Sequence, residues 1–212
     1  MKTLYFDCSS GISGNMTLGA LTEIIGDENF LIEELKKLNV HGYHIEISKK
    51  VKNGIIGTYV DVILEHNHHH HDGEHHHHEH RNLDDVNKII DNSSLDENVK
   101  ELSKRIFLRV AKAESKVHNK PLNEVHFHEV GAIDSIVDIV GTAILINKIN
   151  PDKIISSVVN DGHGFIECAH ETMSVPVPAT SEIFASSNVK FRQIDIDTEL
   201  VTPTGAAIIA EL

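Results

Sequence analysis

Histidine is concentrated in one internal stretch of this 212-residue sequence. Ten of the 17 histidines lie between residues 66 and 80, mixed with acidic residues, glycine and asparagine. Imidazole suits nickel, zinc and copper, and a flexible run can enclose several ions without a preformed site. An expression tag would stand at a terminus, and a neutral linker would need no histidine. The predicted metal ligands are His66, His68, His69, His70, His71, His75, His76, His77, His78 and His80.

A second cluster places histidines beside regularly spaced carboxylates. His126 and His128 face the same side if the chain is extended there. Asp134 and Asp138 lie one helical turn apart and share a helix face. That helix is otherwise apolar, and a metal ion or cationic partner would offset the cost of burying unpaired carboxylates. The alternative is that the helix N-terminus stabilises Asp134 and a lysine pairs with Asp138. The spacing favours a catalytic site made of His126, His128, Glu129, Asp134 and Asp138.

Two loops rich in small polar residues each lead into a predicted helix. Backbone N–H groups at such a helix start can cradle a phosphate. The first loop is not a Walker loop, because no Gly-Lys-Ser/Thr follows it. For the first loop a tight turn with Ser caps is the alternative, and the loop taken by itself favours it. The second loop, from Glu199 to Ala207, is a weak signal of an anion site. The candidate cofactor-binding residues are Asp7, Ser9, Ser10, Gly11, Ser13, Gly14, Thr202, Thr204 and Gly205.

The elements that must position these residues follow from hydrophobic periodicity. Helices are predicted at 16–25, 28–38, 84–90, 95–117, 131–149, 178–187 and from Thr202-Pro203 onward, and strands at 3–6, 154–159, 165–168 and 191–196. Alternating residues from Tyr43 to Leu64, with Asn53-Gly54 between them, predict a hairpin. Gly162 and Gly164 predict a tight turn, and His163 and His170 are further candidate ligands. The fold class is α+β or mixed α/β.

The domain organisation follows from the same pass along the chain. Residues 1–65 form the strand–loop–helix start and the hairpin, and residues 66–81 form a disordered, mobile His-rich loop with almost no apolar content. Residues 82–212 form helices and short strands that we expect to make one compact domain with 1–65. The last predicted helix stops after barely two turns, which suggests that part of a larger architecture is absent.

Composition narrows the class of protein. The net charge of −13 argues against nucleic acid and anionic membranes as main partners. It suits a protein that attracts cations, although the charge by itself favours plain solubility as the explanation. The two cysteines, Cys8 and Cys168, form no disulfide framework. No signal peptide and no apolar stretch of about 18 residues is present. We therefore expect a soluble cytoplasmic protein.

Taken together, these segments resemble the family of nickel-insertion proteins that mature lactate racemase. The resemblance is carried by residues 7–16, the histidine tract, residues 126–141, 168–180 and 199–207, in the family's order. The segment Phe127-His128-Glu129-Val130-Gly131-Ala132-Ile133-Asp134-Ser135 is the most specific of them. Departures are Asn15 in place of Asp, Glu171 in place of Gly, and Ser174 and Val177 in a proline-rich stretch.

The resemblance implies a nickel chelatase of the lyase type. Its substrate would be a pyridinium dithiocarboxylate mononucleotide, which receives nickel through one carbon–nickel bond and sulfur–nickel bonds. It implies Ni²⁺, CTP with Mg²⁺ or Mn²⁺, lactate racemase apoprotein as a partner, and a distal nucleotide-binding part encoded as a separate chain. A homo-oligomer is compatible with it. Two alternatives stay open, a non-catalytic nickel store or chaperone and a metal-dependent nucleotide hydrolase.

Overall fold

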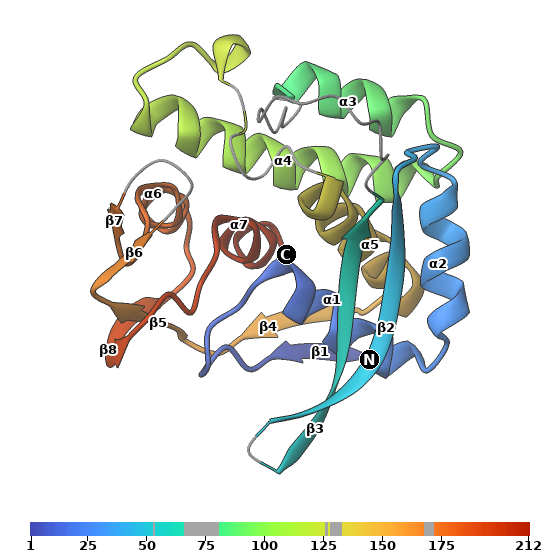
Figure 1. Ribbon diagram of the computed structural model, residues 1–212, viewed down its shortest axis with the longest axis horizontal. Coiled ribbons are helices and arrows are strands. Elements are labelled where there is room, and N and C mark those ends of the chain that lie inside the picture. The colour runs from blue at the N-terminus through green and yellow to red at the C-terminus, as the bar shows by residue number, and fades with distance from the viewer. Residues whose placement is uncertain (53, 66–80, 126, 128–132, 168–171) are drawn as a thin grey trace, which may run out of the picture.

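A computed structural model describes residues 1–52, 54–65, 81–125, 127, 133–167 and 172–212 (Figure 1). Strand β1 (Thr3–Phe6) pairs in parallel with β4 (Lys153–Ser156), and β5 (Val159–His163) pairs in parallel with β8 (Phe191–Asp197). Beyond β1 the two segments stay hydrogen-bonded with a one-residue shift in register, because the N–H of Ser157 donates to the carbonyl of Phe6 and the N–H of Asn160 donates to the carbonyl of Cys8. Three neighbouring parallel segments therefore lie side by side with their carboxyl ends at one edge. They are β1, the β4–β5 segment and β8.

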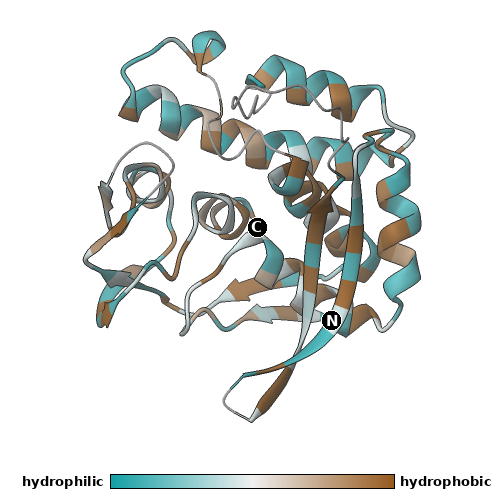
Figure 2. Ribbon diagram, viewed as in Figure 1, coloured by the Kyte–Doolittle hydropathy of each residue, from teal (hydrophilic) through white to brown (hydrophobic). Residues whose placement is uncertain are grey.

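Helices cover one face of these strands. They are α1 (Gly14–Ile25), α4 (Glu97–Val117), α5 (Ile133–Ile149), α6 (Pro178–Ala185) and α7 (Pro203–Glu211). The central helix α5 buries residues on every side, as its almost uniformly apolar sequence predicts. The outer helix α4 buries only a stripe that includes Val99, Ile106 and Val110 (Figure 2). None of the described helices combines the length and the apolar character that crossing a membrane requires.

The predicted hairpin is formed by β2 (Tyr43–Lys52) and β3 (Ile55–Leu64), with α2 (Glu28–Lys36) beside it. Its inner half packs on α1, where a Cβ on Gly19 would lie 2.2 Å from the carbonyl oxygen of Thr58. Its outer half extends past the body of the molecule (Figure 1). Ile55 there is 76% exposed, so the arm ends in apolar side chains that face solvent.

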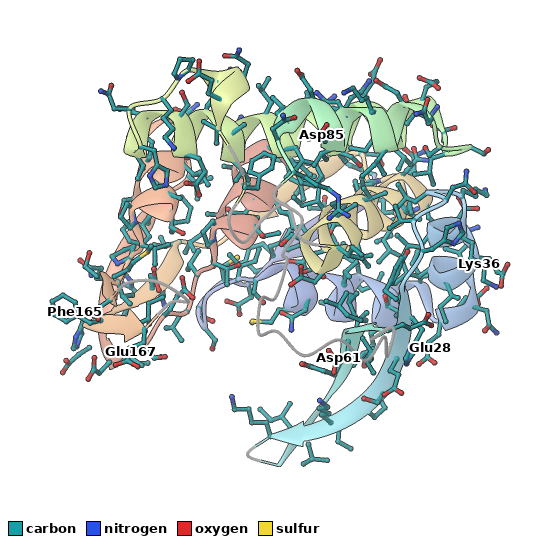
Figure 3. All side chains as sticks on the ribbon, turned by 45° about the horizontal axis from the view of Figure 1, so that its top comes forward. Glu28, Lys36, Asp61, Asp85, Phe165 and Glu167 are labelled. Carbon is teal, nitrogen blue, oxygen red and sulfur yellow. The ribbon has the colours of Figure 1, made fainter. Side chains whose placement is uncertain are left out.

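The remaining described elements complete the periphery. Helix α3 (Leu83–Asp91) begins with a capping box between Asn82 and Asp85, and η1 (Leu122–Glu124) is a single 3₁₀ turn. Strands β6 (Phe165–Glu167) and β7 (Thr172–Ser174) pair antiparallel. Phe165 and Glu167 lie at the end of the molecule opposite Glu28 and Lys36 of α2 (Figure 3).

The mixed α/β class and most predicted elements are confirmed. Helix α1 begins at Gly14, two residues earlier than predicted, and α2 ends at Lys36, two residues earlier. The prediction of a turn at Gly162 is wrong: Gly162 lies inside β5, and only Gly164 has the positive φ of a turn. Strand β7 was not predicted. The His-rich loop lies outside the described residues, and the domain boundaries stay a prediction.

Candidate functional site

The loop that follows β1 turns sharply at the carboxyl edge of the strands. The Asp7 carboxylate accepts hydrogen bonds from the N–H and the hydroxyl of Ser9, which lower the pKa of Asp7. Gly11 closes the turn by donating its N–H to the carbonyl of Cys8. Ser9 and Ser10 remain exposed at the tip. Asp7 is thus engaged by Ser9 of its own loop, and the neighbouring Ser10 is exposed to solvent.

The second half of the loop is locked to the segment before α7. Gly11 has φ +83°, and a Cβ there would lie 2.0 Å from the carbonyl oxygen of Leu200. Ile12 forms a parallel bridge with Val201. The fully buried Asp161 holds that segment, because its Oδ1 accepts from the N–H groups of Leu200 and Val201. The two loops singled out in the sequence therefore lie against each other.

Helix α1 begins against a carboxylate of α5. The Ser13 hydroxyl caps α1 by accepting from the N–H of Met16. A Cβ on Gly14 would lie 2.2 Å from Oδ2 of Asp138, so only glycine leaves room for this carboxylate. An anion near the first turn of a helix is stabilised by the helix dipole. The start of α1, which the sequence marks as an anion site, is thus next to an acidic side chain of the protein itself.

Asp138 is the strongly perturbed acid of this region. Burial and, to a smaller extent, the charge of Asp134 one turn earlier together raise its pKa from 3.8 to about 7. Asp138 makes no ion pair within the described part of the chain, so the lysine partner considered above is not found there. Asp134 is exposed and accepts from the N–H of Ser135. A carboxyl group that exchanges its proton near neutral pH suits proton transfer.

The raised pKa predicts how Asp138 affects stability. A carboxyl group whose pKa is higher in the folded state holds its proton more tightly in that state. The free energy of unfolding therefore falls as pH rises from about 4 to about 7. Asp138→Asn removes this loss. In metal-free protein we expect the mutant to be more stable than the parent by about 2–4 kcal/mol at pH 8, with no difference near pH 4.

Urea unfolding at several pH values, with a chelator present, measures this difference. Asp134→Asn is the matched control, because it removes a like charge from the exposed position and should stabilise the protein less. Parallel stability curves for the parent and Asp138→Asn across this pH range would contradict the prediction.

The start of α7 is occupied by its own cap. The Thr202 hydroxyl accepts from the N–H of Gly205, and a Cβ on Gly205 would lie 2.2 Å from the carbonyl oxygen of Ile12. Thr204 is buried. These three residues cap α7 and hold it against the first loop. Anion binding by them stays a prediction.

The residues predicted to hold metal are only partly within the described structure. His126, His128, Glu129 and the histidines of residues 66–80 lie outside it. In the ranges that are described, no three His, Cys, Asp or Glu side chains gather closely enough to hold a metal ion. Burial raises the pKa of the Cys8 thiol to about 11, which disfavours the thiolate that binds metals. His163, a further candidate, lies 3.0 Å from Oδ1 of the exposed Asp195.

Three polar residues near the loop were not recognised as site residues from the sequence. They are Asn160, Asp161 and Arg192, and hydrogen bonds connect them to the two loops. For Asn160 and Asp161 the only sequence signal is that two polar residues follow an apolar strand. Arg192 carries no local signal, because its partner lies 32 positions away.

The fold and the site together define a mixed α/β protein in which carboxylates meet the start of a helix beside a polar loop. The profile of the nickel insertion protein family matches residues 4–212, and the chain belongs to this family. No solved structure matches it.

Several relatives carry the name pyridinium-3,5-bisthiocarboxylic acid mononucleotide nickel insertion protein, among them the following three. That of Acetivibrio thermocellus is 55% identical over 209 residues, which are 99% of this chain and 51% of the relative. That of Clostridium acetobutylicum is 48% identical over 234 residues (99% and 55%), and that of Lactiplantibacillus plantarum 47% over 223 residues (100% and 53%). The chain spans about half the length of the curated relatives it matches.

Proposed function

We propose that this chain is the nickel-handling half of a cytoplasmic insertase that places nickel in a pyridinium-3,5-bisthiocarboxylic acid mononucleotide. The observation that carries the proposal is the 55% identity, over 99% of the chain, to a relative named for that reaction. A distal half on a separate chain completes the insertase, and lactate racemase apoprotein receives the finished cofactor.

The histidine tract supplies nickel and the folded site uses it. Ten imidazoles between residues 66 and 80 hold several ions weakly and keep the local nickel concentration high. His126, His128, Glu129 and Asp134 then position one ion for transfer. Nickel is cargo in this scheme, so weak binding by the tract is an advantage because it permits release.

Asp138 serves as the proton acceptor. A carbon–nickel bond forms when the ring carbon loses its proton and its electron pair binds Ni²⁺, with no change of nickel oxidation state. The proton passes to the Asp138 carboxylate, whose pKa of about 7 suits a base at neutral pH. Asp138 lies beside Gly14 at the start of α1, next to the Ser9–Gly14 loop that would hold the substrate.

CTP and its Mg²⁺ or Mn²⁺ are assigned to the distal half. The first loop lacks the lysine of a Walker motif, and the start of α1 already lies against Asp138. These residues fit a nucleoside triphosphate poorly, and no step of the chemistry above runs through it.

The test is reconstitution with the purified distal half. The mixture, supplied with nickel, CTP and the mononucleotide, should yield nickel-containing cofactor by mass spectrometry and should activate lactate racemase apoprotein. His128→Ala should lower the yield about 100-fold or more without unfolding the chain. His77→Ala, in the tract, is the matched control and should change it less than twofold.

The alternative functions give different results in the same assay. Nickel retention without any insertion, even with the distal half present, would identify a store or chaperone. Phosphate release from nucleotide in the absence of nickel would identify a hydrolase. Either result, obtained with folded protein, rejects the proposal.

A further inference from the structure

A buried amide joins the first loop to an arginine on the neighbouring strand. Asn160 is 6% exposed, and its Nδ2 donates to the carbonyl oxygen of Ser9 at 2.9 Å. Its Oδ1 accepts from Nε of Arg192 at 2.8 Å. Asn160 and Arg192 are paired residues of the parallel strands β5 and β8, so their side chains leave the sheet on the same face. The amide thereby connects the guanidinium of Arg192 to the backbone of Ser9.

The bond to Asn160 uses only one edge of the guanidinium. Within the described ranges, the two terminal nitrogens of Arg192 have neither a hydrogen bond nor an ion pair. Arg105 and Arg109, in contrast, both pair with Glu211. In a chain of net charge −13, a cation that is held in place and left without a carboxylate partner is available to an anionic ligand.

The two ends of the Ser9–Gly14 loop differ in charge, and this difference indicates the chemistry of the ligand. At the Gly14 end the Asp138 carboxylate stands at the helix start, where it repels a phosphate when ionised. At the Ser9 end Asn160 links the loop backbone to the guanidinium of Arg192, and guanidinium N–H groups bind phosphate oxygens in pairs. A phosphorylated ligand with a cationic ring would therefore direct its phosphate to Arg192 and its ring toward the acids.

We propose that Arg192, held by Asn160, binds the phosphate group of a pyridinium mononucleotide at the exposed Ser9–Ser10 tip. This inference rests on the proposed function, because that function supplies the mononucleotide. It separates the binding of the phosphate from the nickel chemistry at Asp138.

The test compares two commercially accessible probes that differ only in the phosphate. Nicotinic acid mononucleotide and nicotinic acid riboside share the pyridinium ring and the ribose. By calorimetry on the full chain, without nickel, the parent should bind the mononucleotide about tenfold or more tightly than the riboside, the effect of a charge-assisted hydrogen bond. The strongly negative net charge opposes this preference, so a general electrostatic effect would not produce it.

Arg192→Gln should reduce the ratio of the two affinities to within twofold, while Arg192→Lys keeps part of it. Lys190→Gln is the matched control, because it removes the same charge from an exposed position two residues earlier and should leave the ratio unchanged. A parent protein without the preference, or an Arg192→Gln mutant that keeps it, overturns the proposal. Nickel binding by equilibrium dialysis is measured separately, so loss of the proposed nickel function would be seen without any change in the phosphate result.

Discussion

Replacing the ten histidines between residues 66 and 80 by serine is expected to lower the number of nickel ions bound per chain several-fold and to leave the fold intact. Imidazole nitrogen is the main donor for nickel in this stretch, and serine is a poor ligand for it. The stretch contains no Val, Ile, Leu, Met or Phe that could join a core. Equilibrium dialysis measures the stoichiometry, and the thermal unfolding midpoint checks the fold.

The same replacement should spare insertion at saturating nickel, because the tract supplies the ion and does not carry the chemistry. Serine in place of His41, His44 and His118, outside the tract, is the control and should leave the stoichiometry nearly unchanged. In the parent, loading should fall steeply as pH drops through about 6 to 7, since imidazole must be neutral to bind metal. Unchanged loading near pH 5, or complete loss of insertion at saturating nickel, would count against this role.

Gly11→Ala should destabilise the protein by about 3 kcal/mol, through a positive φ that alanine disfavours and a clash with Leu200. The Cβ would lie 2.0 Å from a backbone carbonyl oxygen, which cannot move without breaking the bridge between Ile12 and Val201. Since this bridge holds the two loops together, nickel insertion should fall with stability. Differential scanning calorimetry should show a melting temperature lower by roughly 10 °C.

Gly26→Ala separates the two causes. Gly26 ends α1 with φ +70°, and a Cβ there meets nothing within 4 Å. This variant carries the backbone strain alone and should cost about 1 kcal/mol. Equal losses for the two variants would show that the contact with Leu200 does not hold the loops.

The prediction on Asp138 and that on Arg192 concern opposite ends of one loop. At one end burial sets the protonation of an acid, and at the other an amide sets the orientation of a cation. The two are independent in mutagenesis because no bond in the described structure joins Asp138 to Arg192. A double mutant should therefore show additive effects on the free energy of unfolding, measured in urea without ligand.

The sequence alone determined the features that depend on neighbours along the chain. The hairpin of Tyr43–Lys52 and Ile55–Leu64 followed from alternation and an Asn-Gly turn, and α4 followed from apolar residues spaced by three or four. The family could also be recognised from the sequence, because its short motifs occur along the chain in the family's order and can be read without the fold. Metal binding by the histidine tract is also predicted from the sequence alone, because it rests on composition.

Only the tertiary structure decided which distant residues meet. Glycine is common in turns, and for that reason the sequence predicts a turn at Gly162. In the structure Gly162 is a strand residue, and its missing side chain lets the carbonyl of Thr198 approach the backbone. Gly14 accommodates Asp138, and Asn160 holds Arg192, across separations that no local periodicity encodes. Local patterns report which face of an element is apolar. They do not report which other element packs against that face. This packing raises the pKa of Asp138 and places Asn160 where it can accept a hydrogen bond from Arg192.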